Sequence, residues 1–422
     1  MHIEKLHDFP DNPIDGGIYE IIPDKSKIVS STNRLFNKYP TRYISAVPRF
    51  AIQKYSNPGD VVLDPFCGSG TTAIEAMLLG RNALSIDIDP FARLLISVKT
   101  ARYTDDDIRL LDSVLERLKS DCQNIPNSVC TLPDLQNIDK WFSSDAQKKL
   151  AFIKSKINTY AADNEKIKKF LLVVLAGIIR KSSNADEVSP KPYISTRYPK
   201  TPEDAVELFF KFAALYRPAI IEFTNDVSSN TCWSKILESN DARTIGYENI
   251  DLAVTSPPYI NAYDYVRSLR FEDVWLDLSS ENELRTNRKS YVGSEVSNRL
   301  NCEHTYTQQS QQLLSIINEI SASDKRRAKI VSTYFDDMAK NLLSVRDSLK
   351  DNGVYVIVVG DSVIREQHIP TAKILTDIAE KNGYSYELSF KYVIRDRYLH
   401  LPRGNRGGII KYDEILVLRK TK

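Results

Sequence analysis

The sequence is poor in the residues that bind metals or form disulfides. It has five cysteines and five histidines among 422 residues, and both are scattered along the chain. Because the cysteine number is odd and no two cysteines stand in a C-x-x-C pair, neither a disulfide framework nor a structural zinc site is expected. Only 15 residues are glycine, which excludes fibrous and low-complexity proteins. We therefore expect no metal in this protein.

Long hydrophobic segments are also absent from the sequence. The longest clear apolar run, Phe170 to Ile179, has ten residues, whereas a membrane-spanning helix needs about 18. The residues Met1 to Lys5 lack the basic and then apolar order of a signal peptide. The net charge is small as well, because 57 basic and 55 acidic residues give +2. We expect a cytoplasmic protein without membrane contact, in which any nucleic-acid surface comes from local charge clusters.

The pattern of apolar residues and turn signals predicts an α/β protein with a helical interruption. Residues 1–40 are expected to be irregular, because prolines and glycines break them repeatedly. Predicted strands occupy 61–64, 83–87, 235–237, 252–254, 354–359, 384–394 and 414–418, and predicted helices occupy 43–55, 73–79, 332–349 and 370–382. Between 104 and 228 only helical spacing appears. The expected fold is a doubly wound, mostly parallel, Rossmann-like sheet of seven strands with a large helical insertion.

A glycine-bearing turn follows the first predicted strand. Gly68 and Gly70 stand between that strand and a helix, and Asp87 ends the next strand, 19 residues after Gly68. Glycines let the backbone approach a ligand closely, and the helix offers unpaired N–H groups at its N-terminus. An acid at the end of the second strand can accept hydrogen bonds from both ribose hydroxyls. Unless the glycines only serve packing, the pattern predicts an adenosine-type cofactor, either a nicotinamide dinucleotide or S-adenosylmethionine.

A second motif, Ser256-Pro257-Pro258-Tyr259, directly follows the apolar strand at 252–254. Its two prolines fix the backbone and remove two N–H donors, so the motif presents mainly hydrogen-bond acceptors. Such an edge suits an exocyclic amino group, because accepting both of its hydrogens draws the nitrogen lone pair out of conjugation with the ring. Tyr259 offers a flat face for stacking a base. A loop of this kind can also be purely structural, but its place after a strand of an α/β sheet favours a catalytic role.

Together the two motifs resemble those of the amino-group DNA methyltransferases. The resemblance rests on Asp64-Pro65-Phe66-Cys67-Gly68-Ser69-Gly70-Thr71-Thr72 and on Thr255-Ser256-Pro257-Pro258-Tyr259. Members of this family transfer a methyl group from S-adenosylmethionine to cytosine N4 or adenine N6, mostly in bacterial restriction–modification systems. The resemblance implies that Ser256, Pro257, Pro258 and Tyr259 are catalytic. It implies that the cofactor is bound by Asp64, Pro65, Phe66, Gly68, Gly70, Thr71, Asp87, Ile88, Asp241 and Ala242.

The family assigns these residues to different parts of the cofactor. By resemblance, the glycine motif lines the methionine part, Asp87 holds the ribose, Ile88 lies against the adenine and Asp241 contacts the adenine amino group. The chain then divides into a cofactor-binding half with an N-terminal segment at 1–103, a helical insertion at 104–228, and a catalytic half at 229–422. We expect no extra domain after the core. Target recognition is therefore expected in the insertion, in the polar stretch at 279–325 within the catalytic half, or in both.

The resemblance implies double-stranded DNA as the substrate, with the target base flipped out of the duplex. It also makes a cognate restriction endonuclease a candidate partner. Between residues 391 and 411 six basic residues stand against one acid, so this stretch is either a phosphate-binding loop or an ordinary solvated one. The candidate phosphate contacts are Arg395, Arg397, Arg403 and Arg406.

The sequence favours one target atom over the others. No cysteine follows a proline, so the thiolate chemistry of cytosine carbon-5 methylation is not expected. Serine in the first position of the tetrad is commoner in the family's cytosine-N4 enzymes, so we expect cytosine N4, with adenine N6 as the alternative. Less favoured alternatives are an RNA or protein-glutamine methyltransferase and a catalytically silent DNA-binding protein. A dinucleotide oxidoreductase would leave the tetrad unexplained.

Overall fold

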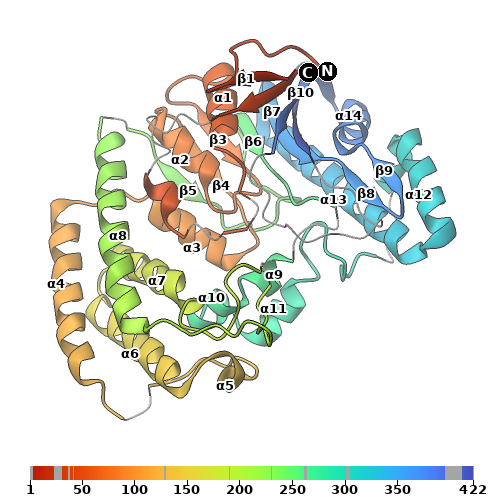
Figure 1. Cartoon of the computed structure of the whole chain (residues 1–422). Helices are drawn as coiled ribbons and strands as arrows, with labels where there is room; N and C mark the ends of the chain where they lie inside the picture. The colour runs from red at the N-terminus through yellow and green to blue at the C-terminus, as the bar shows by residue number, and fades with distance from the viewer. Residues whose placement is uncertain are drawn as a thin grey trace.

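The computed structural model describes residues 3–22, 31–36, 39–40, 42–127, 130–189, 191–229, 231–260, 264–300, 305–394 and 411–421. A nine-stranded sheet in the order β1-β2-β10-β11-β7-β6-β3-β4-β5 forms its centre (Figure 1). The strands of this sheet are β1 (Glu4–Leu6), β2 (Ile18–Ile21), β3 (Val61–Asp64), β4 (Asn82–Ser85), β5 (Ser234–Ile236), β6 (Ile250–Thr255), β7 (Leu349–Gly360), β10 (Tyr384–Val393) and β11 (Tyr412–Lys420). A separate antiparallel pair consists of β8 (Ser362–Ile364) and β9 (Gln367–Ile369).

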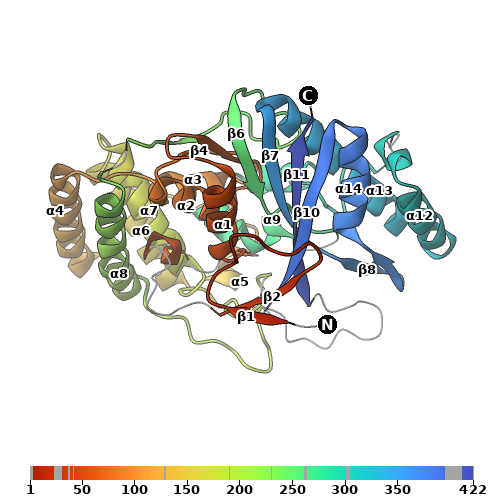
Figure 2. The same ribbon diagram turned by 90° about the horizontal axis from the view of Figure 1, so that it is seen from above.

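Helices cover both faces of the sheet and form a further group beside it (Figures 1 and 2). They are α1 (Ala46–Tyr55), α2 (Thr71–Leu78), α3 (Pro90–Lys99), α4 (Asp105–Asp121), α5 (Ile138–Trp141), α6 (Ser144–Tyr160), α7 (Glu165–Ile179), α8 (Ala205–Asp226), α9 (Tyr265–Ser268), α10 (Arg270–Trp275), α11 (Glu281–Asn287), α12 (Gln311–Ser323), α13 (Lys325–Ser348) and α14 (Thr371–Lys381). The expected class, a doubly wound and mostly parallel α/β fold, is confirmed: β11 alone runs antiparallel to both of its neighbours.

The strand count and the N-terminal segment differ from the prediction. The seven expected strands form the run from β5 to β10, and two more extend the sheet. Residues 1–40 were expected to be irregular, but β2 pairs with β10 and β1 pairs with β2, both in parallel. The reason is aromatic packing: Phe9 and Tyr19 meet Phe390 with ring centroids 5.5 and 5.7 Å apart. Pro10 and Pro13 lie between the two strands, where they remove no ladder hydrogen bond.

The central strands are apolar along their length because helices pack on both faces. In β7, Val354, Val356 and Val358 belong to the core beneath α1 and α2. Tyr355, Ile357 and Val359, which point the other way, belong to the core beneath α13 and α14. Both cores are thus filled from one strand by the alternation of its side chains.

Between Asp105 and Asp226 the described residues form helices and no strand. Helices α4 to α8 share one hydrophobic core with α3 and α10 (Figure 1). The Thr104 hydroxyl and the Asp107 carboxylate form the expected capping box at the start of α4. Within the part of the chain that the structure describes, no helix is long and apolar enough to cross a bilayer.

The site is positioned by the point at which the order of the sheet reverses. Neighbouring strands β3 and β6 are parallel, with Val62 opposite Leu252. The chain continues from β3 outward to β4 and from β6 outward to β7. The connections therefore leave in opposite directions and open a crevice at the carboxyl ends of β3 and β6.

Candidate active site

A cleft of about 770 Å³ opens at these strand ends. Ten of the predicted cofactor and catalytic residues line it: Pro65, Phe66, Gly68, Thr71, Asp87, Ile88, Asp241, Ala242, Ser256 and Pro258. Four others, Asp64, Gly70, Pro257 and Tyr259, are not among its lining residues. The two motifs, which are far apart in the sequence, therefore share one cleft.

The two glycines of the first motif are required for different reasons. Both have positive φ, 46° at Gly68 and 84° at Gly70. A Cβ atom on Gly68 would lie 3.1 Å from the ring of Tyr39, which also lines the cleft. A Cβ on Gly70 would lie 2.8 Å from the Ile96 side chain of α3. Gly68 thus shapes the cleft, whereas Gly70 lets the loop pack on the helix behind it.

Asp64 connects the two motifs instead of facing the cleft. Its carboxylate accepts hydrogen bonds from the Thr72 hydroxyl at 2.5 Å, from the Thr255 hydroxyl at 2.6 Å and from the Phe66 N–H at 3.1 Å. Burial raises the pKa of Asp64 to about 6, against the opposing effect of these donors. The oxygens of Asp64 thus hold the glycine loop to the end of β6.

Asp87 lies in the cleft wall just after β4. Its two oxygens accept hydrogen bonds from the Gly68 N–H at 2.7 Å and from the Asp89 N–H at 2.9 Å. Burial, and then the nearby negative charge of Asp89, raise the pKa of Asp87 to about 7. The Arg93 guanidinium donates to the carbonyl oxygens of Asp87 and Ile88, at 2.8 and 3.0 Å. The carboxylate is therefore held rigidly at the rim that a nucleoside would meet.

At the other end of the cleft, Arg243 grips Asp241 with two hydrogen bonds of 2.8 and 2.7 Å. Partial burial acts against ionisation, but the Arg243 hydrogen bonds keep the pKa of Asp241 below its ordinary value. Arg243 also donates to the buried Asp337 of α13 at 3.1 Å and to the Ser290 carbonyl at 3.0 Å. One arginine thus joins the loop after β5 to α13 and to the segment around Ser290.

The tetrad is supported from the far end of the sequence. The Tyr259 hydroxyl donates to the Asp413 carboxylate at 2.6 Å, and the Tyr392 hydroxyl donates to its other oxygen at 2.9 Å. The Tyr259 proton thus points to Asp413. Burial, and then the negative charge of Asp413, raise the pKa of the Tyr259 hydroxyl. Ser256 lines the cleft, so its hydroxyl oxygen can accept hydrogen bonds there.

The segment 290–293 completes the side of the cleft formed by the tetrad, here called the acceptor side. The sequence did not indicate that this segment contacts the tetrad. Ser290, Tyr291 and Val292 line the cleft, and the Tyr291 hydroxyl donates to Asp89 at 3.2 Å. Gly293 has φ of 77°, and a Cβ there would lie 3.1 Å from the Tyr259 carbonyl oxygen. Part of the polar stretch at 279–325 therefore packs against the tetrad. A single glycine in a polar stretch was the only signal for this contact.

Other lining residues also lay outside the predicted set: Tyr39, Pro40, Arg42, Tyr43, Cys67, Ser69, Asp89, Asn240 and Tyr265. The predicted phosphate contacts Arg395, Arg397, Arg403 and Arg406 lie outside the described residues. The two sides of that stretch meet where the Ile394 N–H donates to the Lys411 carbonyl at 3.1 Å. In the described ranges, no three His, Cys, Asp or Glu side chains are arranged to hold a metal ion.

Comparisons with known proteins point to DNA methyltransferases, as the two motifs do. A family model described as DNA methylase matches residues 17–97. The type II methyltransferase M.MvaI of Kocuria varians is 24% identical over 390 residues, which are 84% of this chain and 83% of that protein. M.BsoBI of Geobacillus stearothermophilus, also a type II methyltransferase, is 23% identical over 400 residues, 82% and 77% of the two chains. The solved structure of TrmN from Thermus thermophilus matches 92% of this chain, but only 53% of its own length is covered, at 10% identity and a TM-score of 0.32.

Proposed function

Since the chain belongs to the amino-group DNA methyltransferases, we propose that it transfers a methyl group from S-adenosylmethionine to an exocyclic amino nitrogen in double-stranded DNA. The observation that carries this proposal is the link through Asp64. Its hydrogen bonds to Thr72 and Thr255 tie the glycine loop to the start of the tetrad. A cofactor-type loop and an edge of acceptors therefore form two walls of one cleft.

The walls of the cleft suit S-adenosylmethionine in their chemistry. Gly68 leaves room beside Tyr39, and Asp87 offers a fixed carboxylate for the ribose hydroxyls. We assign the adenine to Ile88 and to the loop bearing Asp241 and Ala242. The methionine part falls to Pro65, Phe66, Gly68 and Thr71, while Asp64 and Gly70 act as supports behind the wall. When bound, S-adenosylmethionine supplies an electrophilic methyl group on a positively charged sulfur.

The acceptor side has to orient the amino group. The Ser256 hydroxyl oxygen accepts a hydrogen bond from one amino hydrogen, and the backbone carbonyl at Pro257 accepts the other. Accepting both hydrogens turns the nitrogen lone pair out of the ring and toward the cofactor loop. The Tyr259 ring, held through its hydroxyl by Asp413, stacks on the flipped base. The methylated nitrogen then releases one proton to water, so no catalytic base is required.

The proposed target is cytosine N4. The reason is the serine that opens the tetrad, by the family resemblance described above. Adenine N6 is the second candidate, because adenine also presents an amino group beside a ring nitrogen. The names of the type II relatives further suggest a restriction–modification system, and we propose a cognate restriction endonuclease as the partner enzyme.

The direct test measures methyl transfer from labelled S-adenosylmethionine to plasmid DNA and, separately, to total cellular RNA. We expect label in duplex DNA, none in RNA, and none in either substrate with Ser256→Ala. Label that enters only RNA would replace DNA by RNA as the substrate. Binding of a nicotinamide dinucleotide without binding of S-adenosylmethionine, measured by calorimetry, would overturn the proposed function.

A further inference from the structure

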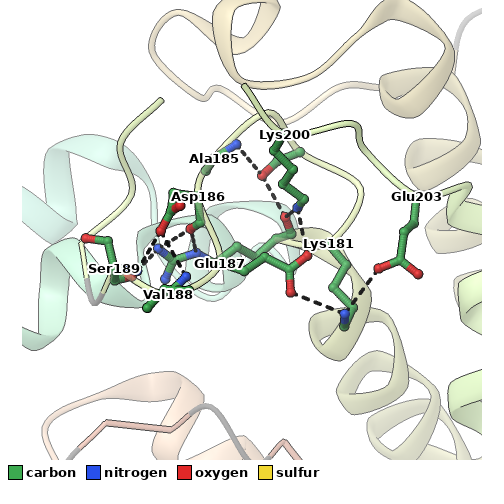
Figure 3. A network of polar contacts seen from close by, with 10 residues as sticks. Lys181, Ala185, Asp186, Glu187, Val188, Ser189, Lys200 and Glu203 are labelled. Carbon is green, nitrogen blue, oxygen red and sulfur yellow. Dashed lines mark hydrogen bonds and ion pairs between the residues drawn. The ribbon is translucent and has the colours of Figure 1, made fainter. Parts of the chain in front are cut away.

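A loop joins α7 to α8, and its two stems are fixed just after the end of α7 (Figure 3). The Lys181 ammonium lies 3.2 Å from Glu187 in the first stem and 3.2 Å from Glu203 in the second. The Lys200 ammonium lies 3.0 Å from Glu187 and donates to the Arg180 carbonyl at 2.8 Å. These partly buried charges form a network, which stabilises a loop better than an isolated surface pair does.

The backbone of the loop is also closed on itself. The Asp186 N–H donates to the Tyr193 carbonyl at 2.8 Å. The Asp186 carboxylate accepts from the Val188 and Ser189 N–H groups at 2.9 and 2.8 Å, and Arg180 donates to the Asp186 carbonyl. Asp186 is thus engaged with the loop's own backbone and Glu187 and Glu203 with lysines, so the loop is preformed and loses little entropy on binding a partner.

The tip of the loop, residues 188–199, carries a different set of side chains. Val188, Tyr193 and Tyr198 are exposed by 76%, 46% and 71%. Arg197 is exposed and places its guanidinium 5.3 Å from the centre of the Tyr198 ring. The tip contains two basic residues, Lys191 and Arg197, and no acid. Exposed tyrosines beside cations without any acid are suited to a polyanion that also offers flat rings.

The loop lies on the side of the molecule where the cleft opens. Strands β3, β6 and β7 are parallel and β11 is antiparallel to β7, so β3 and β6 end opposite to the C-terminus of the chain. Figure 2 shows the α7–α8 loop on that side, away from the C-terminus. Its base is anchored where the Asn184 N–H donates to the Trp141 carbonyl at 2.8 Å. Trp141 packs on Phe271 of α10, and α10 packs on α3, which begins at the cleft residue Asp89.

We propose that the tip of the α7–α8 loop contacts the duplex DNA that carries the target base. Lys191 and Arg197 pair with phosphates, and Tyr193 and Tyr198 lie against sugars or base edges. Phosphate pairing supplies most of the salt-dependent affinity in such complexes. The proposal rests on the proposed function, and it identifies one part of the helical region as the surface that holds the substrate.

The test compares two double variants of the full chain. Arg197→Ala with Tyr198→Ala removes a cation and a large exposed side chain from the tip. Lys211→Ala with Leu215→Ala removes a cation and a large exposed side chain from α8 and serves as the matched control. Affinity for a fluorescein-labelled mixed-sequence duplex is measured at several salt concentrations, and affinity for S-adenosylhomocysteine is measured by calorimetry.

We expect the tip variant to bind the duplex about tenfold more weakly and with a salt slope smaller by about one. Its affinity for S-adenosylhomocysteine and its melting temperature should equal those of the control. Glu187→Gln removes the ion pairs with Lys181 and Lys200 but leaves the side chains of the tip intact. This variant should weaken duplex binding by a smaller factor. Parental duplex affinity in the tip variant would overturn the loop proposal while leaving the proposed function intact. A parent chain that binds no S-adenosylhomocysteine would instead contradict the proposed function.

Discussion

The cofactor side and the acceptor side of the cleft differ in how far apart their interacting residues lie in the sequence. On the cofactor side, Asp87 binds Gly68 at a separation of 19 residues, and Asp64 binds Thr72 at a separation of eight. On the acceptor side, Tyr259 binds Asp413 across 154 residues. The glycine-loop part of the cofactor side is made within one βαβ unit, whereas the acceptor side forms only when distant segments have packed.

This difference predicts which substitutions should impair each side of the cleft. A local motif keeps its geometry as long as its own strand and helix fold. The tetrad, in contrast, depends on Gly293, Tyr392 and Asp413, none of which belongs to it. Substitutions far from the tetrad in sequence should therefore reduce methyl transfer without reducing cofactor affinity. Substitutions in the glycine loop should affect cofactor binding first.

The largest effect is expected from Ser256→Ala. The variant loses the acceptor that is aimed at the amino group, so the rate of methyl transfer should fall by about 10²–10³, as it does when one group that stabilises a transition state is removed. Affinity for S-adenosylmethionine should remain that of the parent. Ser228→Ala, at an exposed position after α8, is the control. If Ser256→Ala methylates DNA at the parental rate, the tetrad is not the acceptor site.

Asp413→Asn sharpens the comparison because it changes only the direction of a hydrogen bond. An asparagine amide can donate to Tyr259, whereas the carboxylate only accepts from it, so the Tyr259 hydroxyl and ring lose their fixed orientation. We expect kcat to fall by roughly tenfold, consistent with the loss of one hydrogen bond to a charged group, with KM for S-adenosylmethionine unchanged. Tyr392→Phe removes one donor to Asp413 but leaves the hydrogen bond from Tyr259, so its kcat should lie closer to that of the parent.

The pH dependence of S-adenosylmethionine binding tests the role of Asp87 on the cofactor side. Burial raises its pKa to about 7 from an ordinary value of 3.8, so the carboxyl loses its proton only as pH rises through 7. Because the ionised form is the better acceptor for ribose hydroxyls, affinity for S-adenosylmethionine should increase over this range, by up to about tenfold per pH unit. Calorimetry between pH 5.5 and 8 should show this rise in the parent and not in Asp87→Asn. A pH-independent parental affinity would remove Asp87 from the ribose site.

The same raised pKa has a consequence for stability. The folded chain holds the Asp87 proton more tightly than the unfolded chain, so this contribution is fully present below about pH 4 and is lost as pH rises through 7. Melting temperatures of the parent and of Asp87→Asn should therefore diverge with rising pH, to the advantage of Asn. A difference in melting temperature that stays the same at every pH would contradict the raised pKa of Asp87.

The smallest effect is expected from Gly293→Ala, for which the chain offers a matched control. Gly293 and Gly246 both have positive φ, 77° and 63°, but only at Gly293 would a Cβ approach the tetrad. Either alanine should lower the free energy of unfolding by about 1–2 kcal/mol because of backbone strain. Only Gly293→Ala should also reduce methyl transfer, by a few fold. Equal rates of methyl transfer by Gly293→Ala and Gly246→Ala would show that the 290–293 segment does not support the tetrad.

The features that the sequence could predict are those made by local contacts, and the features that it could not predict depend on contacts between distant segments. The predicted strand at 61–64 coincides with β3, and Asp87 and Ile88 were found in the cleft, because local periodicity and glycine positions determine a βαβ unit. Strands β1 and β2 were missed, because segments of three and four residues show no readable period. Gly293 and Asp413 stand in segments without a motif, and only tertiary packing brings them to the tetrad. The hydrogen bonds by which Asp64 links the two motifs were not predicted, since a motif indicates which residues gather and not which way each side chain points.

The most direct test of the proposed site is the identity of the methylated nucleoside. Duplex DNA is incubated with the protein and S-adenosylmethionine carrying a deuterated methyl group, digested to nucleosides and separated by chromatography with mass detection. We predict deuterated N4-methylcytosine, and none with Ser256→Ala. Deuterated N6-methyladenine would correct the base and keep the site. Deuterated 5-methylcytosine, or no labelled nucleoside from a chain that binds both S-adenosylmethionine and duplex DNA, would contradict an acceptor edge built for an exocyclic amino group.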